Sequence, residues 1–238
     1  MRSLPKDEVR VFSLALEGLS PEAFARASAL LDDDERAHAA RKKLPDDRRL
    51  YQAAHALLRL ALSSVAKAAP TAWRFRRDER GRRTIAVPED GCGLSFSLSH
   101  TRGLAACAVC LGREVGVDAE HLKRRELEDR NVARSCFTPA ELSMLDALEP
   151  GRRPSERVAL FTFKEAWAKA RGLGLALDLQ SFSVALEPPA LVFAADDEPA
   201  HWLLARHQPT PQYTVALAAR RRLGEALKVH FLEGKTLF

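Results

Sequence analysis

The chain has 238 residues, of which 46% are hydrophobic and 29% are charged, a composition typical of folded, soluble proteins. No segment approaches the run of about 18 apolar residues that a membrane helix needs, and the start, "MRSLPKDEVR", lacks the apolar stretch of a secretion signal. We therefore expect a cytoplasmic protein without a membrane partner. The net charge of +5 favours an anionic partner, because basic surfaces attract nucleic acids, phosphorylated ligands and acidic proteins.

The first half of the chain is expected to contain one long helix followed by short strands. Residues 50–67 have alanine and leucine at helical spacing, and a proline at position 70 prevents the helix from continuing. The runs "AWRF" and "RTIAV" flank a turn that contains Gly81 and predict a hairpin. Alternating and apolar runs then predict strands over residues 94–100, 103–111 and 114–122.

The second half repeats this order. Thr138, Pro139 and Glu141 form the N-cap, first position and capping-box partner of a helix over residues 137–148. A longer helix is expected over residues 157–171, with Gly172 as its left-handed C-cap. The runs "SFSVAL", "ALVFA", "HWLLARH" and "YTVALAA" follow as strand candidates.

A helix followed by three or four strands, twice over, predicts two similar lobes. Strands that follow one another without helices between them favour antiparallel sheets. The predicted fold class is α+β, with each lobe a helix packed on a small, mostly antiparallel sheet. We expect an N-terminal lobe over residues 1–114, a C-terminal lobe over 115–220 and a loosely attached tail over 221–238, with a ligand site between the lobes.

Positive charge is concentrated in two stretches of the first half, residues 36–49 and 74–83. Neither stretch interleaves aromatic residues in the manner of a single-strand nucleic-acid binder. For any single residue, a solvated surface is the ordinary interpretation, and binding of an anion is the alternative.

The four cysteines do not form a recognisable metal site. Cys107 and Cys110 have CxxC spacing, but they lie in an apolar strand-like run, and no second pair or nearby histidine completes a zinc set. Buried or half-buried free thiols are therefore expected, Cys92 and Cys136 included.

Two carboxylates lie two residues apart in "GVDAE". In a strand, Asp118 and Glu120 point to the same face, and like charges this close raise each other's pKa unless a cation neutralises them. A divalent cation such as Mg²⁺ does so with few protein ligands, since water and substrate phosphates complete its shell. The alternative is an ordinary solvated strand end.

The second long helix carries charges among bulky apolar residues. Glu165 and Lys169 are at i and i+4 in the favoured order for an ion pair, which on a surface needs no function. Phe161, Phe163 and Trp167, however, make the helix apolar around most of its circumference. Because charged residues are seldom fully buried without partners, we expect Glu165 and Lys169 to border a cleft and the neighbouring Lys164 to point elsewhere.

Ser99 and His100 end a predicted strand. A hydrolase is disfavoured, because neighbouring strand residues point apart and no GxSxG motif is present. His100 could instead donate to a phosphate, and a structural histidine is the alternative.

Taken in order, these motifs resemble the Sfp-type 4′-phosphopantetheinyl transferases. The family's marks are a serine-histidine strand end, a G-[IV]-D-x-E strand, and a W-x-x-K-E-[AS]-x-x-K helix followed by a glycine pair. The matching segments are "FSLSHT" (96–101), "GVDAE" (116–120) and "FTFKEAWAKARGLGL" (161–175), with further agreement in "ERAHAARKKLPDDRRLYQAAHALLR" (35–59), "RGR" (80–82) and "CFTPAEL" (136–142). Two departures are Phe161, which replaces the usual tryptophan, and Leu173, where some relatives carry a lysine.

The resemblance implies roles for individual residues. Asp118, Glu120 and Glu165 match the family's Mg²⁺ ligands, and Glu165 is also the candidate base, directly or through a water. The resemblance implies that Lys169 lies near the transferring phosphate and acts in catalysis together with His100. The residues implied to bind coenzyme A are Ser99, His100 and Lys169, together with Arg36, Arg41, Arg77 and Arg82.

The implied reaction is the Mg²⁺-dependent transfer of the 4′-phosphopantetheine arm of coenzyme A to a serine of an apo acyl or peptidyl carrier protein, with release of 3′,5′-ADP. Family members of this length are two-lobed monomers with pseudo-twofold symmetry. One alternative is a metal-dependent phosphohydrolase or nuclease that uses the same three carboxylates. The other is a non-catalytic, basic nucleic-acid-binding protein, which three spaced carboxylates disfavour.

Overall fold

The structure, a computed structural model, describes residues 4–79, 81–88 and 93–238, so that Cys92 and Arg80 lie outside the described residues. By its internal contacts the chain divides into two units. Unit 1 comprises residues 1–113 and 228–238, and unit 2 comprises residues 114–227. The division thus falls within one residue of the predicted boundary between the lobes.

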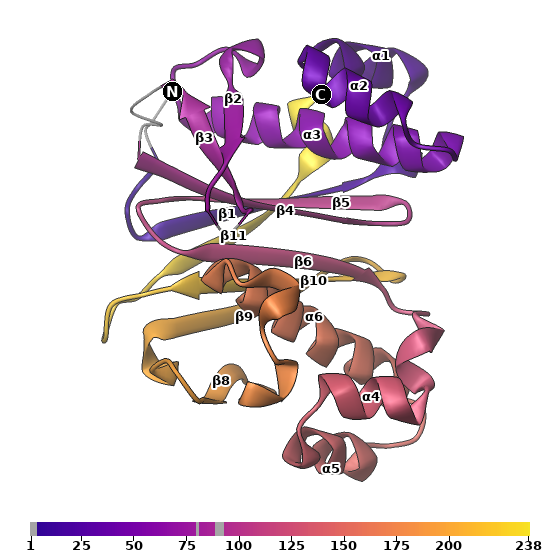
Figure 1. The fold of residues 1–238 in the computed structure, drawn as a ribbon, viewed down its shortest axis with the longest axis vertical. Coiled ribbons are helices and arrows are strands. Elements are labelled where there is room, and N and C mark those ends of the chain that lie inside the picture. The colour runs from indigo at the N-terminus through magenta and orange to yellow at the C-terminus, as the bar shows by residue number, and fades with distance from the viewer. Residues whose placement is uncertain (1–3, 80, 89–92) are drawn as a thin grey trace. The chain divides into compact units, whose positions relative to one another are not determined.

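The centre of unit 1 is a long helix packed on a four-stranded sheet of order β11-β1-β5-β4 (Figure 1). Its helices are α1 (Pro21–Ala29), α2 (Asp33–Ala40) and α3 (Pro45–Val65). Its strands are β1 (Glu8–Ala15), β2 (Arg74–Arg77), β3 (Arg83–Val87), β4 (Leu94–Thr101), β5 (Leu104–Leu111) and β11 (Lys228–Glu233). Helix α3 packs on β5 and β4.

Helix α3 begins earlier than its apolar spacing predicts. Pro45 occupies the first turn, and Asp46 and Asp47 follow it, where proline and acidic residues favour a helix N-terminus. The predicted hairpin is confirmed: β2 pairs antiparallel with β3, and Gly81 in its turn has φ +78°, a conformation that favours glycine.

The expectation of a loosely attached tail is wrong. Strand β11 pairs in parallel with β1, and β1 pairs antiparallel with β5, so residues from both chain ends lie in one sheet. Neither strand was expected from the sequence. Gly234 follows β11 and lies so close to Leu57 of α3 that an added Cβ would come within 2.9 Å of its Cδ1.

Unit 2 is a helix on the antiparallel sheet β6-β10-β9. Its helices are α4 (Arg130–Cys136), α5 (Pro139–Ala147) and α6 (Arg153–Arg171). Its strands are β6 (Val115–His121), β9 (Trp202–Thr210) and β10 (Tyr213–Arg220), together with the antiparallel hairpin of β7 (Phe182–Leu186) and β8 (Pro189–Ala194). The predicted capping box at Thr138 and Glu141 is confirmed, as is the left-handed C-cap at Gly172, whose φ is +68°.

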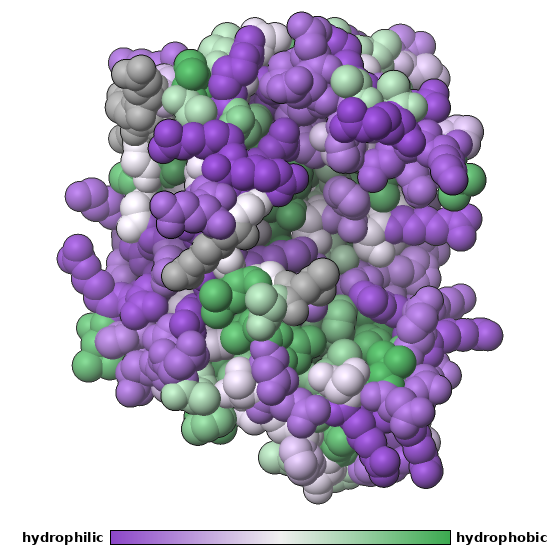
Figure 2. Space-filling model, in the orientation of Figure 1, coloured by the Kyte–Doolittle hydropathy of each residue, from purple (hydrophilic) through white to green (hydrophobic). Residues whose placement is uncertain are grey.

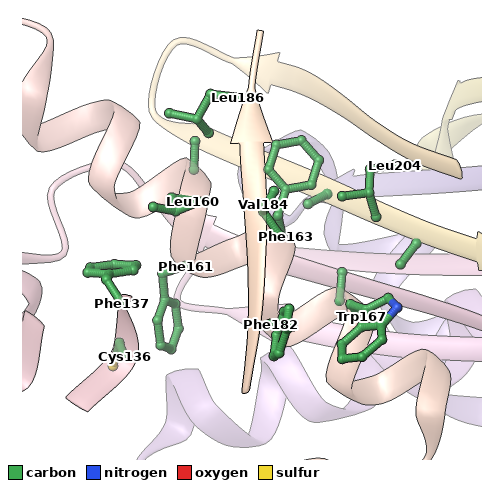
Figure 3. Close-up of a cluster of buried hydrophobic side chains, with 14 of the residues drawn as sticks. Cys136, Phe137, Leu160, Phe161, Phe163, Trp167, Phe182, Val184, Leu186 and Leu204 are labelled. Atoms are coloured by element: carbon green, nitrogen blue, oxygen red, sulfur yellow. The ribbon is translucent and has the colours of Figure 1, made fainter. Parts of the chain in front are cut away.

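The core of unit 2 is aromatic. Figure 3 shows Phe161, Phe163 and Trp167 of α6 with Phe182 of β7, and the rings of Trp167 and Phe182 lie 4.3 Å apart between centroids. Burial of such rings is a large part of the stabilising free energy of a domain of this size. The α+β class, with a helix on a mostly antiparallel sheet in each unit, is confirmed, and the pseudo-twofold stays a prediction.

Cys107, Cys110 and Cys136 are buried free thiols, as predicted. Burial raises the pKa of Cys107 and raises that of Cys110 to about 12, so the reactive thiolate forms of these two are scarce at neutral pH. Hydrophilic residues predominate on the face shown in Figure 2. None of the helices in the described residues has the length and hydropathy to cross a membrane.

Candidate active site

Strand β6 and helix α6 bring the predicted carboxylates together in unit 2. A Cβ added at Gly116 would lie 1.9 Å from the carbonyl oxygen of Ala166 and 2.4 Å from the amide nitrogen of Ala170. Only glycine therefore lets α6 approach β6 this closely. Because alternate strand residues share a face, Asp118 and Glu120 lie on the same face of β6 as Gly116, toward α6.

Asp118 is the centre of this cluster. Asp118 is only 5% exposed, and Nζ of Lys169 in α6 donates a hydrogen bond to Oδ1 of Asp118 at 2.6 Å. Lys169 thus pairs with a carboxylate of the strand, which sequence spacing did not predict. The pair fixes α6 against β6 at the level of the acidic residues.

Asp118 also acts on the two glutamates through its charge. Burial, and then the negative charge of Asp118, raise the pKa of Glu120 to about 7, against the opposing charges of Arg124 and Lys169. Burial and the charge of Asp118 likewise raise the pKa of Glu165. Glu120 of β6 and Glu165 of α6, from two distant segments, thus both lie within the electrostatic field of Asp118.

The residues are not arranged as a finished metal site. Among the residues that the structure describes, no three His, Cys, Asp or Glu side chains are placed to hold a metal ion, and Lys169 and Arg124 contact Asp118 and Glu120 instead. The chemistry of the donor set nevertheless fits Mg²⁺, which takes carboxylate oxygens from few protein residues and completes its shell with water and phosphate. A cation there would also relieve the repulsion between the carboxylates.

Lys164 points away from this cluster, as expected, and has a structural contact. It is fully buried, and its Nζ donates to both carboxylate oxygens of Glu141, at 2.6 and 2.8 Å, and to the carbonyl of Phe182 at 2.9 Å. Glu141 also accepts the backbone N–H groups of Thr138 and Val184. Burial lowers the pKa of Lys164, and the charge of Glu141 opposes this. This network joins α5, α6 and β7.

In unit 1, the predicted coenzyme A residues are placed on β4, the β2–β3 hairpin and α2. On β4, Ser99 is buried and His100 is exposed. Arg36 forms an ion pair with Asp33 at 2.8 Å, and Arg82 forms one with Asp78 at 3.1 Å. Each arginine is thus paired with an aspartate three or four residues before it in the chain. Arg77 donates to the carbonyl of Gly81 at 2.6 Å.

A basic cluster in unit 1 was only partly predicted. Burial and the charges of Lys42, Arg41, Arg83 and Arg77 all lower the pKa of His38, so these four cations lie within electrostatic range of one histidine, and Arg41 contacts its Nδ1 at 3.1 Å. The predicted Arg41 and Arg77 therefore both act on His38.

His100 belongs to the same region. Arg83 lies 2.6 Å from Nδ1 of the buried His55, and the pKa of His55 is lowered by burial, by Arg83 and, in smaller part, by His100. Tyr51 stacks on both His38 and His55. The helical spacing of Tyr51 and His55, four residues apart, was the available signal for this missed cluster.

Comparison with known proteins identifies relatives of the chain. Residues 114–218 match the model of the 4′-phosphopantetheinyl transferase superfamily. The chain is 33% identical over 188 residues to the 4′-phosphopantetheinyl transferase HetI of Nostoc sp. (strain PCC 7120), covering 78% of this chain and 77% of that protein. It is 29% identical over 147 residues to the 4′-phosphopantetheinyl transferase Sfp of Bacillus subtilis (strain 168), covering 61% and 62%.

A solved structure of a holo-(acyl-carrier-protein) synthase from Bacillus anthracis, in complex with CoA, is also similar, with a TM-score of 0.36 and 23% identity over 45% of this chain and 94% of that one. That structural similarity is too low to support a conclusion. The coverage and identity of the HetI match, however, are sufficient: the chain belongs to the 4′-phosphopantetheinyl transferase superfamily.

Proposed function

We propose that the chain transfers the 4′-phosphopantetheine arm of coenzyme A to a serine of an apo acyl or peptidyl carrier protein, with release of 3′,5′-ADP. The observation that supports this most is the cluster of Asp118, Glu120 and Glu165 beside Lys169, in a chain whose relatives are named transferases of this kind. Acidic residues that gather beside a lysine suit a reaction at a phosphate.

Asp118, Glu120 and Glu165 would hold Mg²⁺. A bound ion would neutralise negative charge on the pyrophosphate of coenzyme A. The rest of the chemistry is assigned to the chain's own side chains.

In the proposed reaction the serine oxygen attacks the phosphorus that carries pantetheine. A new P–O bond forms, the P–O bond to 3′,5′-ADP breaks, and Glu165 takes the serine proton directly or through a water. Lys169, which contacts Asp118 in this structure, stabilises the negative charge that develops on the leaving phosphate. Such contacts lower the barrier because positioned charges replace mobile water.

The basic cluster of unit 1, made of Arg41, Lys42, Arg77, Arg83 and His100 around His38 and His55, is proposed to bind the phosphates of the nucleotide. The positive charges that lower the pKa of His38 support this, because a bound phosphate would meet several cations at once. Ser99, Arg36 and Arg82 remain proposed contacts that rest on the resemblance.

Carrier domains are typically acidic, so the net charge of +5 would speed their encounter with the enzyme. We further propose that the protein acts as a cytoplasmic monomer.

The test is mass spectrometry of an apo carrier protein after incubation with the chain, coenzyme A and Mg²⁺. A mass gain of one phosphopantetheine is expected, and a carrier whose acceptor serine is replaced by alanine should show none. Cleavage of nucleotide or nucleic acid without a carrier, and no mass gain, would instead indicate the phosphohydrolase or nuclease.

A substitution tests the role of Glu165. Glu165→Gln removes the base and a proposed metal ligand, and we expect transfer to fall by at least about 10²-fold, while thermal unfolding followed by circular dichroism stays close to that of the unchanged protein. Glu149→Gln, at an exposed position of the same unit, is the matched control and should transfer normally. Normal transfer by Glu165→Gln would remove Glu165 from the mechanism.

A further inference from the structure

Arg124 follows β6 and reaches back four residues to Glu120. Its Nη1 donates to Oε1 of Glu120, and its guanidinium carbon lies 4.5 Å from the centre of the Phe161 ring. The side chain of Arg124 is 33% exposed, whereas that of Glu120 is 15% exposed. The arginine therefore covers a mostly buried carboxylate and keeps a path to solvent for itself.

The backbone fixes this arrangement. Leu122 donates to the carbonyl of Gln212 at 2.8 Å, and Arg124 donates to the carbonyl of His121 at 3.1 Å. The side chain of His121 accepts the N–H of Lys123 at 3.0 Å through its Nδ1. The turn after β6 thus holds Arg124 next to Glu120, and the Phe161 ring supports the guanidinium by a cation–π contact.

We propose that Arg124 is a built-in counter-ion of Glu120 that competes with the divalent cation for this carboxylate and thereby sets the metal affinity of the site. This inference rests on the proposed function in one respect, namely that Glu120 is a metal ligand.

The physical reason is that a guanidinium and a divalent cation cannot both approach the same carboxylate oxygens, since like charges repel. The cation binds only to the form in which Arg124 has moved away. Its apparent affinity is reduced by the fraction of molecules in that form. Because Arg124 is partly exposed, its guanidinium can be rehydrated when it leaves, so the competition is reversible.

The experiment is calorimetric titration of the full, metal-free chain with Mg²⁺ alone. Arg124→Gln should bind Mg²⁺ about tenfold more tightly than the unchanged protein, a ratio that corresponds to about 1.4 kcal/mol. Arg125→Gln is the matched control, because it removes the same charge from the exposed next residue, and its affinity should change by less than about twofold because solvent and salt screen that charge. Arg124→Lys keeps the charge and therefore the repulsion of the cation, and its affinity should remain within about threefold of the unchanged protein.

Thermal unfolding checks that Arg124→Gln is folded, with Arg124→Ala as the second variant. Mg²⁺ binding that is detectable only in these variants supports the competition. Equal affinity in Arg124→Gln and Arg125→Gln overturns it. If no variant binds Mg²⁺, the inference falls, whereas the carrier assay with Mg²⁺ decides separately whether the transferase function stands.

Discussion

Two lysines of α6, five residues apart, have different surroundings and different roles. Lys169 contacts Asp118 with a side chain that is 29% exposed, whereas Lys164 is fully buried against Glu141. A helix turns by about 100° per residue, so residues five apart lie on different faces. The sequence predicted the separation, and the structure identified Glu141 as the partner of Lys164.

Glu35 of α2 is a buried carboxylate that contacts His55 and Arg83 of the basic cluster of unit 1. Its Oε2 accepts from Arg59 Nε at 2.8 Å, and its Oε1 lies 2.9 Å from His55 Nδ1. Burial alone would raise its pKa, but the hydrogen bonds and charges of His55 and Arg59 outweigh this and lower the pKa to about 2.

This lowered pKa predicts a pH dependence of stability. Because the folded-state pKa lies below the ordinary value of 4.5, the ionised group stabilises the fold above about pH 4.5, and this stabilisation is lost as the pH falls toward 2. The loss should be about 3 kcal/mol. Denaturant titrations between pH 6 and pH 2 measure it, within the range where the protein still refolds.

Glu35→Gln should be less stable at pH 6 and should lose less free energy of unfolding on acidification. The exposed Glu17 of the same unit supplies the control, because Glu17→Gln should keep the full acid dependence. An unchanged acid dependence in Glu35→Gln would contradict the assignment.

At the scale of elements, the site depends on how closely α6 packs on β6. Gly116→Ala places a methyl group where the backbone of α6 now lies, 1.9 Å from the Ala166 carbonyl oxygen. We expect the helix to move outward, the unfolding free energy to fall by about 3 kcal/mol, and transfer to fall with it, because Lys169 loses its contact with Asp118. Chemical denaturation and the carrier assay measure the two effects.

Gly151→Ala is the matched change, since a Cβ there meets no atom within 4 Å and its φ is not in the left-handed region. Its stability should stay within about 0.5 kcal/mol of the unchanged protein. If Gly116→Ala behaves in the same way, the close approach of α6 to β6 is not needed.

At the scale of the whole molecule, the C-terminal residues complete unit 1. Removal of residues 228–238 takes away β11 and the contact between the carbonyl of Phe238 and Arg26, which is 3.0 Å long. It also leaves β1 as an open sheet edge, and such edges promote association between chains. We expect a lower melting temperature and aggregation in light scattering.

Lys235→Ala, at an exposed position of the same segment, should melt as the full chain does. A truncated chain that melts at the same temperature and stays monodisperse would show that β11 contributes nothing to unit 1.

The sequence by itself determined the elements whose signals are local. The strand and helix spacings, the Thr138 capping box and the Gly172 C-cap were readable because each involves neighbours within a few residues. The placement of Asp118 and Glu120 on one face of a strand was also predictable, because it depends only on their spacing of two residues. The motifs that carry the family resemblance were predictable because each lies within a short stretch of sequence.

Only the tertiary structure decided the contacts between distant segments. The pairing of β1 with β11, the contact of Lys169 with Asp118, and the contact of Arg83 with His55 all join residues far apart in the chain. Periodicity describes which face a side chain takes on its own element, but not which element covers that face. That choice depends on packing, which is a property of the folded chain.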